Sequence, residues 1–303
     1  MKKILTILTG VLILGLTSAA NAQAAEGYIV VERHSTRVLV ASNTEEKIPQ
    51  GAFSQLATVK VALDWAKASN TSLATTMIVP NGIVVVNNPL QLQPGDQIAL
   101  RDAIYSISMA NDEASSMMVA DFVGRKLLQH RQQGGDSVGT FVKEMNHFGK
   151  SLKLKNTKFL SPSGGKGTTT VSDLARLASG ILKTHGYSFY TDQKSRKLNI
   201  VRVSGETEKL TVINNNKLLG KTSISGMMVD GVSAVLSADR KPFVEKLPND
   251  SSKVTPVQLI VINVASQNLD VRAQQLVTEG WAQYDAWREA GYPASKEAKE
   301  YLR

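Results

Sequence analysis

The hydrophobic pattern of the chain begins with strand periodicity and then changes to helical periodicity. Residues 27–42 carry β-branched residues on both sides of a polar His-Ser-Thr turn, which predicts two short strands. Residues 56–68 keep an apolar face at helical spacing, and no breaker interrupts them. Residues 75–87 are again rich in β-branched residues, with a Pro-Asn-Gly interruption that divides the segment.

Helical patterns fill the middle of the chain and return at its end. Apolar residues at helical spacing predict helices at 100–109, 114–128, 137–152, 170–184 and 271–289. Asp112 or Asn111 can cap the second of these helices, with Ser115 in its first turn. We expect Ser172 to cap the fourth.

Strand patterns dominate the segment before the last helix. β-branched and apolar runs predict strands at 199–203, 210–213, 232–237 and 258–264. Strands at both ends with helices grouped between them favour an α+β fold with an antiparallel sheet over alternating βαβ units. Because no repeat or low-complexity linker divides the sequence, we expect a single domain.

The first residues have the pattern of a secretory signal peptide. Lys2 and Lys3 form a basic end, Ile4 to Leu16 is apolar, and small residues near position 22 give a cleavage pattern. The apolar run is shorter than the roughly 20 residues that a membrane helix needs. We therefore expect a signal peptide at 1–24, a folded domain at 25–303, and export to the periplasm or cell envelope of a bacterium.

Composition narrows the chemistry that such a domain can use. The 303 residues contain no Cys, which excludes disulfides, thiolate metal sites and a cysteine nucleophile. The four His are scattered without metal-binding spacing, so we expect no metal and no cofactor. The net charge of +9, or +7 without Lys2 and Lys3, suits anionic cell-wall polymers. Dispersed basic residues and only 6% aromatic residues argue against nucleic acid.

Three segments carry a resemblance to a known family, in order and at matching spacing. They read LQLQPGDQIALRDAIYSISMANDEAS, FVKEMNHFGKSLKLKNTKFLSPSGGKGTTTVSDLARLASGIL and INNNKLLG. They resemble the serine D-alanyl-D-alanine carboxypeptidases, the low-molecular-mass penicillin-binding proteins. The resemblance implies a β-lactamase/transpeptidase-like fold, in which helices flank an antiparallel sheet. It covers most of the chain up to about residue 240.

This family uses three motifs. A Ser-x-x-Lys motif at a helix N-terminus supplies the nucleophile and its base one turn apart. A Ser-x-Asn motif adds a second hydroxyl and an amide that holds the substrate peptide. A Lys-Thr-Gly motif on a strand docks the substrate carboxylate.

The first motif is altered in this chain. When Thr58 is aligned with the family's threonine, Ala52 takes the nucleophile position and Gln55 takes the lysine position. Ser54 lies two residues beyond the expected position, which rotates it about 200° around a helix. The alignment therefore leaves neither a nucleophile nor a base, because an amide cannot act as one.

The second and third motifs are altered as well. Met109 replaces the serine of Ser-x-Asn, whereas Asn111 is retained. The favoured alignment places Met228 at the lysine of the third motif, and a rival alignment keeps Lys221 there. The apolar Met109, Met227 and Met228 either offer an adaptable surface to a ligand or fill the emptied site as core.

The resemblance thus implies a family member with degenerate catalytic motifs. One hypothesis is a pseudoenzyme that binds a peptidoglycan peptide or an envelope protein. The alternative is an active D-Ala-D-Ala carboxypeptidase or hydrolase with an unusual nucleophile, Ser54 or Ser163. Ser163 and Lys166 form the chain's Ser-x-x-Lys sequence outside the signal, but they lie in a Gly-rich loop.

Overall fold

A computed structural model describes residues 26–184, 186–220, 224–229, 233–246, 252–293 and 301–302. The expected signal peptide at 1–24 lies outside these residues. Among the helices of the described stretches, none combines the length and the apolar character that a membrane crossing requires.

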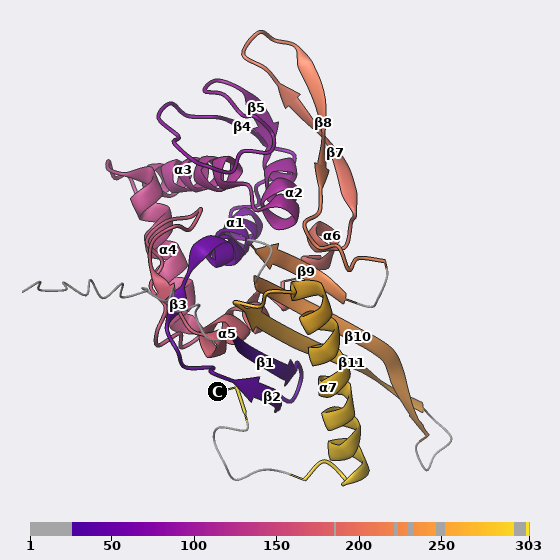
Figure 1. Ribbon diagram of the computed structural model, residues 1–303. Coiled ribbons are helices and arrows are strands. Elements are labelled where there is room, and N and C mark those ends of the chain that lie inside the picture. The colour runs from indigo at the N-terminus through magenta and orange to yellow at the C-terminus, as the bar shows by residue number, and fades with distance from the viewer. Residues whose placement is uncertain are drawn as a thin grey trace, which may run out of the picture.

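The largest sheet joins the two ends of the chain (Figure 1). Its first strand pairs with its last, since Gly27 lies opposite Val264 and Glu32 opposite Leu259. All its neighbouring strands are antiparallel. The strand order is β2 (Val38–Ser42), β1 (Gly27–Glu32), β11 (Ser252–Val264), β10 (Ser233–Lys246) and β9 (Ile224–Val229).

The alternation of side chains along β1 and β11 divides the apolar core in two. Ile29 and Val31 face the larger cluster of buried residues, whereas Val30 faces a second, smaller cluster. Ile260 and Leu259 are divided between the two clusters in the same way. Because successive side chains point to opposite faces of a strand, both faces of this sheet are buried.

Helices cover both faces of this sheet. On one face, α5 (Val171–Leu182) contacts β1 and β11, and on the other, α7 (Leu269–Glu289) contacts the same strands (Figure 1). The remaining helices are α1 (Ser54–Ala68), α2 (Leu100–Ala110), α3 (Glu113–His130), α4 (Ser137–Ser151) and the short α6 (Ser188–Thr191). This arrangement confirms the predicted α+β class with an antiparallel sheet flanked by helices.

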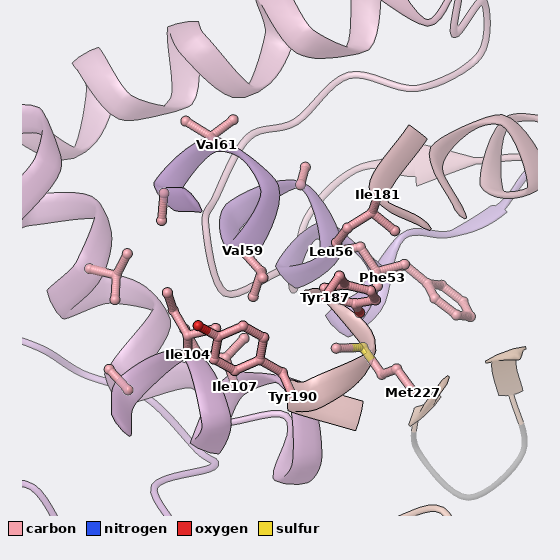
Figure 2. Close-up of a cluster of buried hydrophobic side chains, with 14 of the residues drawn as sticks. Phe53, Leu56, Val59, Val61, Ile104, Ile107, Ile181, Tyr187, Tyr190 and Met227 are labelled. Carbon is pink, nitrogen blue, oxygen red and sulfur yellow. The ribbon is translucent and has the colours of Figure 1, made fainter. Parts of the chain in front are cut away.

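Helix α1 is central and contacts α2, α3, α4 and α5. Figure 2 shows Leu56 and Val59 of α1 packed among Ile104 and Ile107 of α2 and Ile181 of α5. A helix buried around most of its circumference belongs to the core of a large domain. A 3₁₀ turn, Gly51–Phe53, leads directly into it.

Two smaller sheets complete the fold. Four strands form the order β4 (Thr76–Ile78), β5 (Gln97–Ala99), β7 (Ser195–Val201) and β8 (Thr207–Ile213). The hairpin of β7 and β8 extends away from the main sheet (Figure 1). Strands β3 (Ile48–Pro49) and β6 (Thr168–Thr169) form a two-stranded ribbon beside the turn that precedes α1.

Two local predictions were wrong. Thr170, not Ser172, caps α5, because its side chain accepts a hydrogen bond from the backbone N–H of Asp173. The Ser172 hydroxyl instead donates to Glu45. The strand pattern expected over 75–87 forms a strand only at Thr76–Ile78, and the part after the predicted Pro-Asn-Gly interruption, where Gly82 has a φ of 80°, is not a strand.

Candidate functional site

The head of α1 meets two loops that lie far apart in the sequence. The 3₁₀ turn brings the backbone of Gly51 against Gly164, where a Cβ would lie 2.1 Å from the Gly51 carbonyl oxygen. Gly164 also has a φ of 104°, a conformation that side chains rarely allow. This close approach fixes the 161–165 loop beside Ala52, which is half-buried.

The amide of Gln55 joins these elements. Gln55 is fully buried, and its Nε2 donates to the carbonyl oxygens of Asn111 and Ser163, each at 3.2 Å. One turn later, the Thr58 hydroxyl donates to the Pro162 carbonyl at 2.7 Å. Two side chains of α1 therefore hold the 161–165 loop, and Gln55 also holds the junction of α2 and α3.

That junction is built by Asn111 and Asp112. Asn111 ends α2 in the left-handed conformation, with a φ of 55°, and Asp112 caps α3 by accepting from the Ser115 N–H at 2.9 Å. The hydroxyls of Ser106 and Ser115 also donate to Asp112, at 2.6 and 2.7 Å. Burial raises the pKa of Asp112, and these hydrogen bonds oppose that effect. The expected cap is confirmed for Asp112.

Asn87 completes the bonding around Asn111. Its Nδ2 donates at 2.8 Å to the carbonyl oxygens of both Ala110 and Asn111. The carbonyl of Asn111 thus accepts from Asn87 and from Gln55. The carboxylate of Glu113 accepts from the Val86 N–H at 2.9 Å, which anchors the loop that carries Asn87.

A cleft of about 780 Å³ opens in front of Ala52. Amide side chains dominate its lining, Glu113, Lys217 and Asp270 carry charges, and Val86 and Ile213 are largely exposed. No serine, threonine, tyrosine or histidine belongs to the lining among the described residues. The described lining consists of Ala52, Val86, Asn87, Asn111, Glu113, Ile213, Asn214, Asn215, Lys217, Gln267, Asn268, Leu269 and Asp270.

The methionines of the altered motifs lie mainly in the core. Met109 and Met227 are each 1% exposed and belong to the large apolar cluster. Figure 2 shows Met227 beside Tyr187. The carbonyl oxygen of Met109 accepts a hydrogen bond from the backbone N–H of Asn215 at 2.8 Å. Met109 and Met227 are therefore part of the core, as the second of the two interpretations from the sequence predicted.

Of the third motif, the structure describes the backbone of Met228 and Val229. Met228 lies on β9, and its partner across the ladder is Ala234 of β10. Lys221, which the rival alignment uses, lies outside the described residues.

The alternative nucleophiles do not line the cleft. Ser54 is completely buried, and its hydroxyl is 3.5 Å from the Gly51 carbonyl. The Ser163 hydroxyl pairs with that of Ser161 at 3.1 Å. Neither Ser54 nor Ser163 lines the cleft. Lys60 forms an ion pair with Asp64 at 2.5 Å, one turn further along α1.

Sequence reasoning missed part of this site. The loop residue Asn87, the exposed Lys217 and the segment 267–270 before α7 all line the cleft. Lys217 lies within INNNKLLG, the shortest segment that carried the resemblance, so attention to that segment could have found it. Among the described residues, no three His, Asp or Glu side chains gather closely enough to hold a metal ion.

Comparison with known proteins relates most of the chain to one family. A family model described as D-alanyl-D-alanine carboxypeptidase matches residues 15–234. The D-alanyl-D-alanine carboxypeptidase DacF of Bacillus subtilis is 24% identical over 237 residues, which cover 72% of this chain and 57% of that protein. DacC of Escherichia coli is 23% identical over 224 residues, which cover 71% and 50%. The chain spans about half the length of these two relatives.

Solved structures of similar fold agree with the described architecture. A mutant of the Streptomyces K15 DD-transpeptidase has a TM-score of 0.65 at 18% identity, covering 84% of this chain and 97% of that one. A penicillin-binding protein of Listeria monocytogenes, in its ampicillin-bound form, has a TM-score of 0.60 at 17% identity, covering 88% and 96%. These similarities confirm the transpeptidase-like fold.

Proposed function

Because this chain belongs to the D-alanyl-D-alanine carboxypeptidase family, we propose that it is an exported member that binds a peptidoglycan peptide without serine-peptidase chemistry. One observation carries the proposal. The cleft at the head of α1 is lined by Ala52 and by amides, and the described lining contains no hydroxyl. The expected signal peptide at 1–24 supports a place in the bacterial cell envelope.

The groups at the head of α1 do not support acyl transfer. A serine peptidase needs an oxygen nucleophile and a group that accepts its proton. The methyl group of Ala52 has no lone pair, and the neutral amide of Gln55 donates to two carbonyls instead of accepting a proton. Loss of the nucleophile alone costs a serine peptidase on the order of a million-fold in kcat.

The same groups are suited to holding a peptide. Amide side chains offer both donors and acceptors, which match the N–H and C=O groups of an extended backbone. Lys217 is exposed at the cleft and can attract a terminal carboxylate. Since a neutral hydrogen bond contributes only about 1 kcal/mol net, we expect weak, reversible binding.

The hydrolase alternative has less support. Ser54 and Ser163 lie outside the described cleft lining, and Ser54 is buried in α1. An attack by either residue would require rearrangement of the hydrogen bonds that Gln55 and Thr58 make with the adjacent loop. No observation in the described residues favours such a rearrangement.

Calorimetric titration with a pentapeptide that ends in D-Ala-D-Ala tests the binding. We expect saturable binding with no release of D-alanine, and weaker binding by Lys217→Ala. Lys209→Ala is the matched control, because Lys209 is exposed on β8 and does not line the cleft. Absence of binding, or equal loss in both variants, would remove the support for a peptide ligand.

A further inference from the structure

One surface of the molecule carries lysines without acidic neighbours in the sequence. Residues 145–172 contain no Asp or Glu, and their five lysines are Lys150, Lys153, Lys155, Lys158 and Lys166. All five are exposed, and we call them the lysine face. They belong to the end of α4 and to the loop between α4 and β6. Figure 1 shows α4 on the opposite side of the molecule from the hairpin of β7 and β8.

The apolar residues of this segment explain why its lysines face outward. Leu152 packs against α5, since a Cβ added at Gly180 would lie 2.8 Å from its side chain. Leu154 and Phe159 pack against α4, since a Cβ added at Gly149 would lie 3.5 and 3.2 Å from them. The apolar side chains thus fix the segment on the two helices and leave the lysines to solvent.

The backbone of the loop keeps these lysines in one region. The Phe159 N–H donates to the side chain of Asn146 on α4 at 3.0 Å, which folds the loop back along the helix. A Cβ added at Gly167 would lie 3.2 Å from the Lys158 carbonyl oxygen, which brings Lys166 toward Lys158. The lysines therefore share one compact surface.

Acidic residues beside the lysine face are paired with arginines. Glu144 of α4 pairs with Arg131 at 2.7 Å. The buried Asp173 of α5 pairs with Arg176 at 3.2 Å. In the stretches that the structure describes, none of the five lysines takes part in an ion pair. The lysine face therefore attracts anionic partners.

An exposed apolar residue lies among these lysines. Leu160 is 51% exposed, and in the sequence it lies between Lys158 and Lys166. An anionic lipid surface suits this combination, because lysines bind its phosphate groups while their apolar stems and a leucine enter the interfacial layer. A soluble polyanion would bind the charges and leave the leucine in water. The exposed leucine thus favours a lipid partner.

We propose that the lysine face docks on a membrane surface that contains anionic phospholipids, with Leu160 inserted between the headgroups. Because Thr58 holds the same loop against α1 through the Pro162 carbonyl, docking would set the orientation of the nearby cleft relative to the membrane. The five lysines and Leu160 do not line that cleft, so the proposal does not rest on peptide binding.

Sedimentation with lipid vesicles tests the proposal on the chain that begins at residue 25, so that the apolar segment before it does not itself enter the lipid. We expect the protein to sediment with vesicles of equal parts phosphatidylglycerol and phosphatidylcholine, and less so as the salt concentration rises. We expect no sedimentation with phosphatidylcholine alone. Equal binding to both kinds of vesicle, or binding to neither, would overturn the proposal.

Two double variants of equal charge separate the lysine face from the net charge of the protein. Lys155→Gln with Lys158→Gln should bind anionic vesicles about twentyfold more weakly, since each lysine at an anionic surface contributes about fivefold. Lys197→Gln with Lys209→Gln is the matched control, because both lysines are exposed on the hairpin of β7 and β8. Equal loss of binding in the two variants would contradict the assignment.

Leu160→Trp tests the insertion and distinguishes a lipid from a soluble polyanion. Relative to the unmodified protein, we expect the added tryptophan fluorescence to shift to shorter wavelength on anionic vesicles, because the side chain leaves water. Sodium polyphosphate should produce no such shift. A shift of equal size with polyphosphate, or no shift with vesicles, would overturn the assignment of a lipid partner.

Discussion

Two regions around the cleft differ in how far they follow the family pattern. The frame consists of the buried polar residues that hold the surrounding loops, such as Asp112, and the floor is Ala52 at the head of α1. In the frame, buried polar groups share several hydrogen bonds, as at Asp112, which accepts from the hydroxyls of Ser106 and Ser115 and from the Ser115 backbone N–H. On the floor, Ala52 stands where the resemblance implies a serine, and the buried Gln55, one turn later in α1, stands where it implies a lysine. The hydrogen bonds of the frame therefore indicate the fold, and the proposed loss of the reaction rests on the residues of the floor alone.

The segment that carries the family resemblance belongs to this frame. Asp173 accepts from the Asn156 N–H and from the Thr157 hydroxyl, both at 2.8 Å. Asn146 exchanges two hydrogen bonds with the backbone of Phe159, at 2.8 and 3.0 Å. These bonds shape the loop that Gln55 and Thr58 hold against α1. The resemblance in this segment therefore reports the fold and leaves open whether the chemistry is present.

The largest effect should come from breaking the frame at Asp112. Asp112→Ala removes a helix cap and leaves two buried hydroxyls without their acceptor, so we expect a loss of about 3 kcal/mol in the free energy of unfolding. Urea denaturation measures this loss. Asp112→Asn is the milder variant, because it keeps an oxygen acceptor for the Ser115 N–H. A loss below about 1 kcal/mol in the alanine variant would show that the cap contributes little.

A smaller effect is expected at Gln55. Gln55→Ala leaves a cavity in the buried head of α1 and removes its bonds to the carbonyls of Asn111 and Ser163, which should cost about 2 kcal/mol. The same denaturation experiment applies. Gln55→Glu fills the same volume and serves as the comparison, since it replaces the donor by an acceptor that faces two carbonyls. If the glutamate variant were as stable as the native protein, the bonding role of Gln55 would be refuted.

The turn before β5 gives a dependence on pH. Burial alone would raise the pKa of Asp96, but three donors, the N–H groups of Gln93 and Val203 and the guanidinium of Arg202, outweigh it and lower the pKa below its usual range. The unfolded chain then binds a proton at higher pH than the folded chain does. The stability from this group is therefore complete above about pH 5 and is lost as the pH falls through the lowered pKa. Asp96→Asn should flatten the acid side of a stability profile, and an unchanged profile would contradict this.

The smallest change in stability is expected at the floor. Ala52→Ser adds one hydroxyl to a half-buried residue at an open cleft, so the free energy of unfolding should change by less than about 0.5 kcal/mol. We also expect no D-alanine release, because the residue one turn later is still Gln55. Thermal unfolding and an amino-acid release assay check the two parts. Hydrolysis by this single variant would show that the site needs no lysine base.

Much of the fold could be predicted because its signals are local. The alternation in β1 and β11 and the apolar face of α1 are visible in the sequence and match the two buried clusters. The cap of α5 was misassigned because Thr170 and Ser172 are both capping residue types. Only the backbone conformation of Thr170, with a φ of −134° and a ψ of 160°, distinguishes them.

The site was less accessible to sequence reasoning. The positions of Ala52, Gln55 and Asn111 came from the resemblance, and the structure brings Ala52 and Asn111 to one cleft. Asn87 and the segment 267–270 could not be predicted, because amide-rich loop segments have the composition of ordinary turns. Only the tertiary fold brings them to one cleft.

Covalent labelling of the protein with a fluorescent penicillin tests the central claim most directly. An active member of the family, run in parallel, provides the positive control. We predict no stable adduct with the native protein at any concentration that labels the control, because no serine hydroxyl lines the described part of the cleft. A stoichiometric adduct, located by mass spectrometry on Ser54, Ser163 or another serine, would contradict the account.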